Sequence, residues 1–215
     1  MGYTIEELAV KFAMGTLDPS GCTKTEMSLL SMYMNDSNSS TLRQLVMCNV
    51  AGLKTNPNKL GFDGLDSVVE MKPKNINTEL KSKKKLDIGG SYSDMTIPRH
   101  NKFIEQNALI HSGGFVNGTL VYQLEITYGS LAPHFQKQLD KFFMGKHEKN
   151  KYLRSMYFSY KQVQEFSDPK VLFITDNLSE YRKHMSKAMY EYLVYLKSTI
   201  TKKGVGDNQF PASEI

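Results

Sequence analysis

The chain has 215 residues, 40% of them hydrophobic, which is enough for one domain with a sizeable core. No apolar run approaches the roughly 20 residues that span a bilayer, and the first residues lack the basic and apolar regions of a secretory signal. We therefore expect a cytoplasmic protein without a membrane segment, mildly basic with a net charge of +5 and a pI of about 9.0.

Helices and then a hairpin are predicted for the first part of the chain. Capping boxes, in which Thr and Glu stand three residues apart, open helices over residues 4–14 and 23–34. Residues 41–50 fit either a helix or a strand, because periodicity does not settle so short a run. Residues 62–72 are predicted to form a β-hairpin, and Pro73 is expected to end the pairing of its second strand.

The rest of the chain alternates between predicted helices and strands. A helix over residues 98–111 has a proline in its first turn and is stopped by the glycines of residues 112–114. The clearest strand covers residues 119–128. The remaining elements are a helix over 131–143, strands over 153–160 and 171–175, and a long helix over 178–201.

Helices flanking a mixed central β-sheet predict an α/β fold. We expect a single domain over residues 1–215, of which 204–215 are a loose tail. Cys22 and Cys48 have no zinc-ligand spacing and are expected to be free thiols.

The most informative segment covers residues 60–75. Asp63 lies in a glycine-flanked turn, and an apolar run then leads into Glu70, Met71 and Lys72. Because side chains i and i+2 of a strand point to the same face, Glu70 and Lys72 project together while Met71 points into a core. A metal-dependent phosphodiesterase needs two carboxylates for a divalent cation and a lysine for the attacking water or the phosphate.

Asp63 and the run Glu70, Met71, Lys72 resemble the signature of the PD-(D/E)xK nucleases, a superfamily that includes most type II restriction endonucleases. The resemblance covers residues 60–75, and the order of the predicted elements around them is similar to the family core. It implies a central sheet flanked by helices, with Mg²⁺ held by Asp63, Glu70 and the Met71 carbonyl. Lys72 would then orient or activate the attacking water, so that Asp63, Glu70 and Lys72 are the implied catalytic residues.

The motif departs from the family pattern at one position and leaves alternatives open at two others. The departure is Phe62, which stands where the family name has proline. Asp66 is a second candidate for the first acid, although it leaves little room for a turn before Glu70. Some family members add a helix glutamate that reaches the metal through water; Glu26 is the candidate here, but its place in a capping box with Thr23 gives it a structural explanation.

Basic residues gather just after the acidic segment. We expect phosphate contacts from Lys83, Lys84, Arg99, His100 and Lys102. The alternative is a solvated lysine loop, which is how such runs usually behave.

The resemblance and the charge together predict a Mg²⁺-dependent endonuclease that cuts double-stranded DNA at a specific sequence, as type II restriction endonucleases do. A phage or repair nuclease such as a junction resolvase, and a non-catalytic basic DNA-binding domain, are the alternatives. No ATP-binding loop is present. Cutting both strands of a palindrome needs two active sites, so we expect a homodimer that uses either the helix around residues 181–195 or the N-terminal helices.

Overall fold

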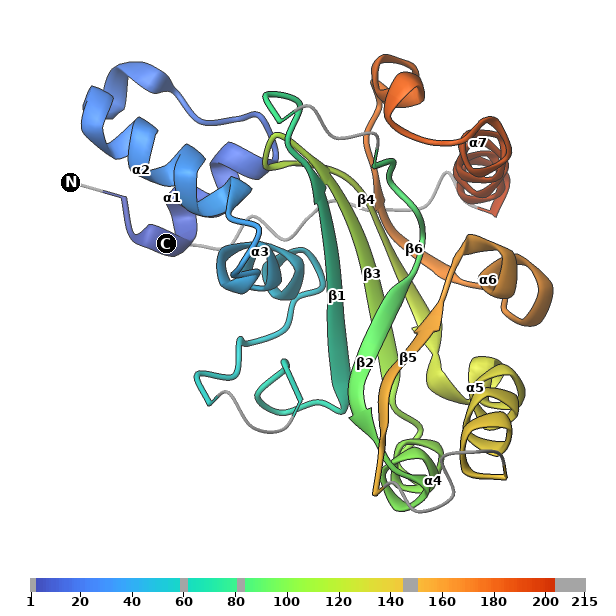
Figure 1. Ribbon diagram of the computed structural model, residues 1–215. Coiled ribbons are helices and arrows are strands. Elements are labelled where there is room, and N and C mark those ends of the chain that lie inside the picture. Colours follow the sequence, from blue (N-terminus) through green and yellow to red (C-terminus); the bar gives the residue numbers. More distant parts are fainter. Residues whose placement is uncertain (1–2, 59–61, 81–83, 145–150, 204–215) are drawn as a thin grey trace.

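A mixed four-stranded sheet forms the centre of the molecule (Figure 1). The structure is a computed structural model, and it describes residues 3–58, 62–80, 84–144 and 151–203. The strands lie in the order β1 (Val69–Ile76), β3 (Leu109–Val116), β4 (Thr119–Thr127) and β6 (Lys170–Ile174). β1 is parallel to β3, whereas the other two pairs are antiparallel. A separate antiparallel ribbon is made by β2 (Gly90–Met95) and β5 (Leu153–Phe158).

Helices cover both faces of this sheet, as the sequence predicts (Figure 1). One face packs against α1 (Ile5–Ala13), α2 (Lys24–Asn35) and α3 (Thr41–Val50). The elements on the other side are the β2–β5 ribbon and α4 (Ile97–Glu105), α5 (Tyr128–Phe143), α6 (Tyr160–Phe166) and α7 (Lys187–Lys203). Short 3-10 helices cover Pro19–Gly21 and Leu178–His184. None of the described helices is long and apolar enough to cross a membrane.

The local signals at the N-terminus are confirmed. Thr4 and Glu7 form a complete capping box at the start of α1, and Thr23 and Glu26 form one at the start of α2. The open choice for residues 41–50 is decided in favour of a helix, α3, whose buried face packs on the sheet.

The prediction of a helix over residues 98–111 is wrong in its second half. Helix α4 ends at Glu105, Asn107 takes a left-handed φ of 51°, and β3 begins at Leu109. The glycines that were expected to stop the helix lie inside β3. A Cβ on Gly113 would lie 2.6 Å from the Met47 sulfur, and one on Gly114 would lie 2.2 Å from the Tyr122 ring, so close packing on both faces requires glycine there.

Pro73 does not end the pairing of its strand, contrary to the prediction. β1 continues to Ile76, and Pro73 stands opposite Gly113 of β3. The Val68 carbonyl accepts a hydrogen bond from Leu109 of β3, whereas the Met71 N–H points to the other side. Because these directions alternate along a strand, position 73 directs its backbone away from β3, where a missing N–H costs no ladder bond.

Three further elements differ from the sequence analysis. The predicted terminal helix over residues 178–201 is a 3-10 helix followed by α7, with a break at Met185. Strand β2 and helix α6 had no clear periodic pattern and were not predicted. The expected loose tail over residues 204–215 lies outside the described residues.

Candidate active site

Asp63 is held against the outer edge of β1. Its N–H donates to the Val69 carbonyl at 3.0 Å, and its Oδ2 accepts from the Met71 N–H at 2.6 Å. Gly64 forms an isolated antiparallel bridge with Thr55, which anchors the loop from the other side. The predicted hairpin over residues 62–72 is wrong in its first strand, because residues 62–68 form a loop and β1 begins at Val69 and pairs with β3. The turn itself exists, and it folds Asp63 back onto the strand that carries Glu70.

Glu70 and Lys72 project from the same face of β1, as their spacing predicts. The Lys72 Nζ lies 2.8 Å from Glu70 Oε2, and the side chains retain only 15% and 10% of their exposure, respectively. Met71 is buried on the opposite face, in the core formed with α1–α3. The structure thus brings a carboxylate and an ammonium together under partial burial, beside the loop that carries Asp63.

The charges at this site influence one another. Burial is the main effect on the Asp63 carboxyl and raises its pKa, and the negative charge of Glu70 raises it further. The hydrogen bond from the Met71 N–H and the positive charge of Lys72 lower the pKa and oppose this shift. Asp63 is therefore within electrostatic range of both other residues. The phenol of Tyr92 also has a raised pKa, first because it is buried and then because of the Glu70 charge.

The donor set suits a hard divalent cation. Mg²⁺ is typically bound through one or two carboxylates and keeps several of its waters. The hydrogen bonds from Met71 and Lys72 use Asp63 Oδ2 and Glu70 Oε2, so Asp63 Oδ1 and Glu70 Oε1 are the oxygens that could bind the cation. The N–H and carbonyl of one strand residue point to the same side, so the Met71 carbonyl faces the edge where Asp63 lies. The described residues hold no group of three His, Cys, Asp or Glu side chains arranged for a metal.

The structure separates the alternative acids. Asp66 is exposed, whereas Asp63 is tied to β1, so the geometry favours Asp63 as the first acid. The Glu26 carboxylate accepts from both the N–H and the hydroxyl of Thr23, which agrees with its structural explanation. The ring centroid of Phe62 lies 5.2 Å from that of Phe103, so this side chain packs against the core.

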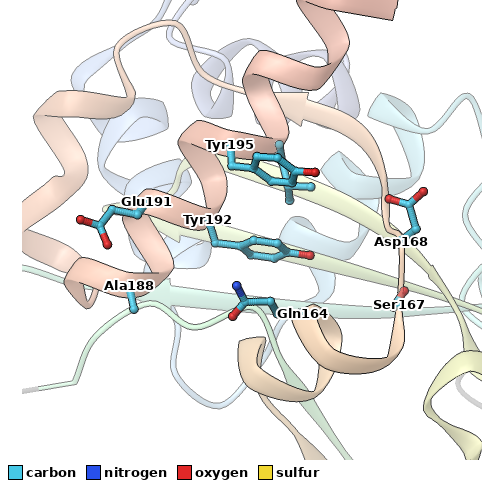
Figure 2. Close-up of a pocket in the computed structure, with 8 residues that line it drawn as sticks. Gln164, Ser167, Asp168, Ala188, Glu191, Tyr192 and Tyr195 are labelled. Atoms are coloured by element: carbon cyan, nitrogen blue, oxygen red, sulfur yellow. The ribbon is translucent and has the colours of Figure 1, made fainter.

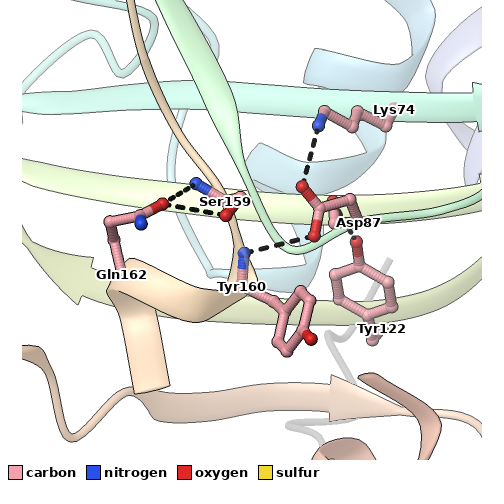
Figure 3. Close-up of polar contacts among 6 residues, drawn as sticks. All are labelled: Lys74, Asp87, Tyr122, Ser159, Tyr160 and Gln162. Carbon is pink, nitrogen blue, oxygen red and sulfur yellow. Dashed lines mark hydrogen bonds and ion pairs between the residues drawn. The ribbon is translucent and has the colours of Figure 1, made fainter. Parts of the chain in front are cut away.

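A cleft of about 560 Å³ runs along β1 beside Lys72. It is lined by the β1 segment from Met71 to Lys74, by the start of β2, by the end of β5, and by Ser40 and Gln44 next to and within α3. Lys74 lies 3.7 Å from Asp87 across this cleft. Asp87 is fixed in turn by the Tyr160 N–H at 3.1 Å and by the Tyr122 hydroxyl, which donates to the Asp87 carbonyl (Figure 3).

The five residues expected to contact phosphate do not form one surface. Lys84 and Lys102 are exposed, and Lys83 lies outside the described residues. Arg99 is half-buried and donates to the Ser93 carbonyl at 3.0 Å. His100 is only 1% exposed and is hydrogen-bonded to the Tyr128 hydroxyl at 2.8 Å, so its prediction as a DNA contact is wrong: burial in the core removes it from any surface ligand.

A second cleft, of about 520 Å³, lies at the opposite edge of the sheet, between α7 and the segment that joins α6 to β6 (Figure 2). Tyr192 and Tyr195 project from α7 towards Asp168. Their rings are stacked, with 6.5 Å between the ring centroids. The lining of the cleft includes Asp168 and Glu191, and no lysine or arginine from the described part of the chain. This cleft therefore suits a polyanion less well than the one beside Lys72.

Sequence reasoning missed Gly90 and Tyr92, which contact Lys72 from β2. The only available signal was the small-residue run over residues 87–94, which is equally consistent with an ordinary loop. Comparison with protein-family models gave no match, and comparison with curated proteins gave no significant match.

Proposed function

We propose that the chain is a Mg²⁺-dependent deoxyribonuclease that hydrolyses phosphodiester bonds of double-stranded DNA at a specific sequence, in the manner of a type II restriction endonuclease. One observation carries the proposal: the loop acid Asp63 is hydrogen-bonded to β1 at Met71, between Glu70 and Lys72, which form a mostly buried ion pair, and Lys72 lines an open cleft. Taking charged groups out of water costs stability even when they are paired, and clusters of partly buried, mutually interacting charges are characteristic of functional sites.

Each residue has a distinct role in this proposal. Asp63, Glu70 and the Met71 carbonyl would hold Mg²⁺, which when bound supplies charge neutralisation and a more acidic water. The Met71 N–H keeps Asp63 in place, since it donates to the carboxylate oxygen Oδ2. Lys72 would donate hydrogen bonds to the attacking water or to the phosphate oxygen on which negative charge develops.

The substrate class rests on charge and on the cleft. The chain carries a net charge of +5, and Lys72 and Lys74 both line the cleft along β1. A phosphodiester backbone is the biological polyanion that matches a hydrolytic site of this type.

The test is cleavage of a mixed-sequence plasmid with and without Mg²⁺. Discrete fragments are expected, and Asp63→Asn or Glu70→Gln should abolish them, while Lys72→Met should slow cleavage roughly 10²–10³-fold. Asp66→Asn is the matched control, because it removes an exposed acid from the same loop.

Other outcomes would change the assignment. Nicks confined to branched or damaged DNA would indicate a repair or phage nuclease such as a resolvase. A gel shift with intact DNA under every divalent cation would indicate a non-catalytic DNA-binding domain, in which Glu70 and Lys72 are only an ion pair.

A further inference from the structure

Two residues of β2, Gly90 and Tyr92, lie against the Lys72 side chain. Its Nζ lies 4.2 Å from the centre of the Tyr92 ring, well within the roughly 6 Å over which a cation and an aromatic face attract. Two residues earlier on the same strand, Gly90 faces the aliphatic part of the lysine. Residues i and i+2 of a strand share a face, so Gly90 and Tyr92 contact one side chain together.

Gly90 leaves the room that the lysine stem occupies. A Cβ on Gly90 would lie 2.8 Å from the Lys72 Cγ and 2.9 Å from its Cβ, closer than real side-chain contacts allow. Gly90 has no unusual φ that would require glycine for its own backbone. The absence of a side chain at position 90 is therefore explained by the path of Lys72.

Tyr92 itself is held rigidly. It is 1% exposed, and its ring makes edge contacts with the rings of Phe103, Tyr128 and Phe135 at 5.7 to 5.8 Å. Its hydroxyl is buried and has no hydrogen-bond partner among the described residues. The ring is thus fixed by its aromatic neighbours and not by a polar contact of the hydroxyl.

We propose that Tyr92 is a positioning residue: the face of its ring, together with the space left at Gly90, holds the Lys72 ammonium in the place where it acts on the scissile phosphate or the attacking water. Glu70 pulls the ammonium from one side at 2.8 Å and the ring supports it from another, so a flexible four-carbon side chain has a single location. The role in cleavage rests on the proposed nuclease function; the placement of Lys72 does not.

The first test needs neither DNA nor metal. An aromatic ring shifts the NMR signals of protons above its face upfield. The Lys72 ε-CH₂ signal is assigned as the one that disappears in Lys72→Arg. It should lie upfield in the wild type and in Tyr92→Phe. It should return to an ordinary value in Tyr92→Leu. Phe115→Leu is the matched control, because it removes a buried ring from the core on the other face of the sheet and leaves Tyr92 and its aromatic neighbours unchanged.

The second test is single-turnover cleavage of plasmid DNA in Mg²⁺. Tyr92→Leu should slow cleavage roughly 10- to 100-fold, as expected for a misplaced catalytic group, while its affinity for a duplex from the same plasmid, measured by anisotropy in Ca²⁺, stays unchanged. Tyr92→Phe should recover most of the lost rate, and Phe115→Leu should cleave like the wild type. If Tyr92→Leu does not fold, Tyr92→Met replaces it, since methionine fills the volume without a ring.

The two hypotheses fail in different ways. A wild-type protein that never cleaves DNA would end the nuclease proposal, and the NMR shift alone would then decide whether the ring holds Lys72. Active wild type with an equally active Tyr92→Leu would overturn the positioning role. A Tyr92→Phe variant as slow as Tyr92→Leu would assign the effect to the hydroxyl and overturn the role of the ring.

Discussion

The pair formed by Glu70 and Lys72 has a structural cost that can be measured separately from catalysis. Both side chains are mostly buried, so Glu70→Ala leaves an ammonium without its partner. We expect the free energy of unfolding to fall by about 2–3 kcal/mol, less than for a fully buried pair. Adding Lys72→Met should restore most of it. Urea unfolding of both variants measures this, and a double variant no more stable than Glu70→Ala would contradict it.

Asp63 is a carboxyl whose ionisation opposes folding in the metal-free protein. Burial raises the pKa of this carboxyl in the folded chain above its ordinary value of 3.8. As the pH rises from 3.8 to the raised pKa, the unfolded chain loses the proton before the folded chain does, so the free energy of unfolding falls. Asp63→Asn keeps an oxygen for the Met71 N–H and removes the charge. The variant should be more stable than the wild type at pH 7 and no more stable below pH 3.8. Urea unfolding at both pH values, without metal, tests the sign.

At the scale of an element, β1 is an edge strand whose two backbone sides are used differently. Pro73 directs its missing N–H away from β3, so Pro73→Ala should change the free energy of unfolding by less than about 1 kcal/mol. Lys74→Pro is the matched contrast, because position 74 faces β3 and the substitution removes a ladder bond, at a cost of roughly 1–3 kcal/mol. Equal effects in thermal or urea unfolding would show that the assigned directions are wrong.

At the scale of the whole molecule, the surface bears on assembly. Met189, Leu193 and Leu196 of α7 are buried in the chain's own core, whereas α2 exposes Leu29, Met32 and Tyr33 along one side. We therefore expect the homodimer to use α2. Met32→Lys should yield monomers in sedimentation, while Tyr195→Lys, at an exposed position of α7, should not. One protomer per duplex, nicking one strand, would contradict the dimer.

Two buried histidines link the stability of the whole fold to pH. Burial lowers the pKa of both His100 and His111, although the Glu125 carboxylate opposes the effect on His111. The unfolded chain therefore takes up protons first as the pH falls through about 6.5. The free energy of unfolding should be lower at pH 5.5 than at pH 7.5. A His100→Gln/His111→Gln variant should show a smaller difference, and an unchanged one would assign the loss to other groups.

Local rules determined the parts of this protein that depend on neighbouring residues. The capping boxes at Thr4 and Thr23 hold their own helix ends, and the spacing of Glu70 and Lys72 puts both on one strand face whatever surrounds them. The α/β class with its mixed sheet followed from the same periodicities. The helix caps and the shared strand face could be predicted because the interactions that cause them span only a few residues.

Tertiary structure decided the features that depend on distant partners. Gly113 and Gly114 do not end a helix but lie in a central strand, where the Met47 side chain and the Tyr122 ring pack so closely that only glycine fits. His100 is a core residue and not a surface ligand, because it is buried against Tyr128, 28 residues later in the sequence, and hydrogen-bonded to its hydroxyl. The contact of Tyr92 with Lys72 depends on how the β2–β5 ribbon lies beside β1. The sequence alone determined which chemical groups β1 carries, whereas only the packing of separate elements determined which of them are buried and what they touch, because burial depends on residues far apart in the chain.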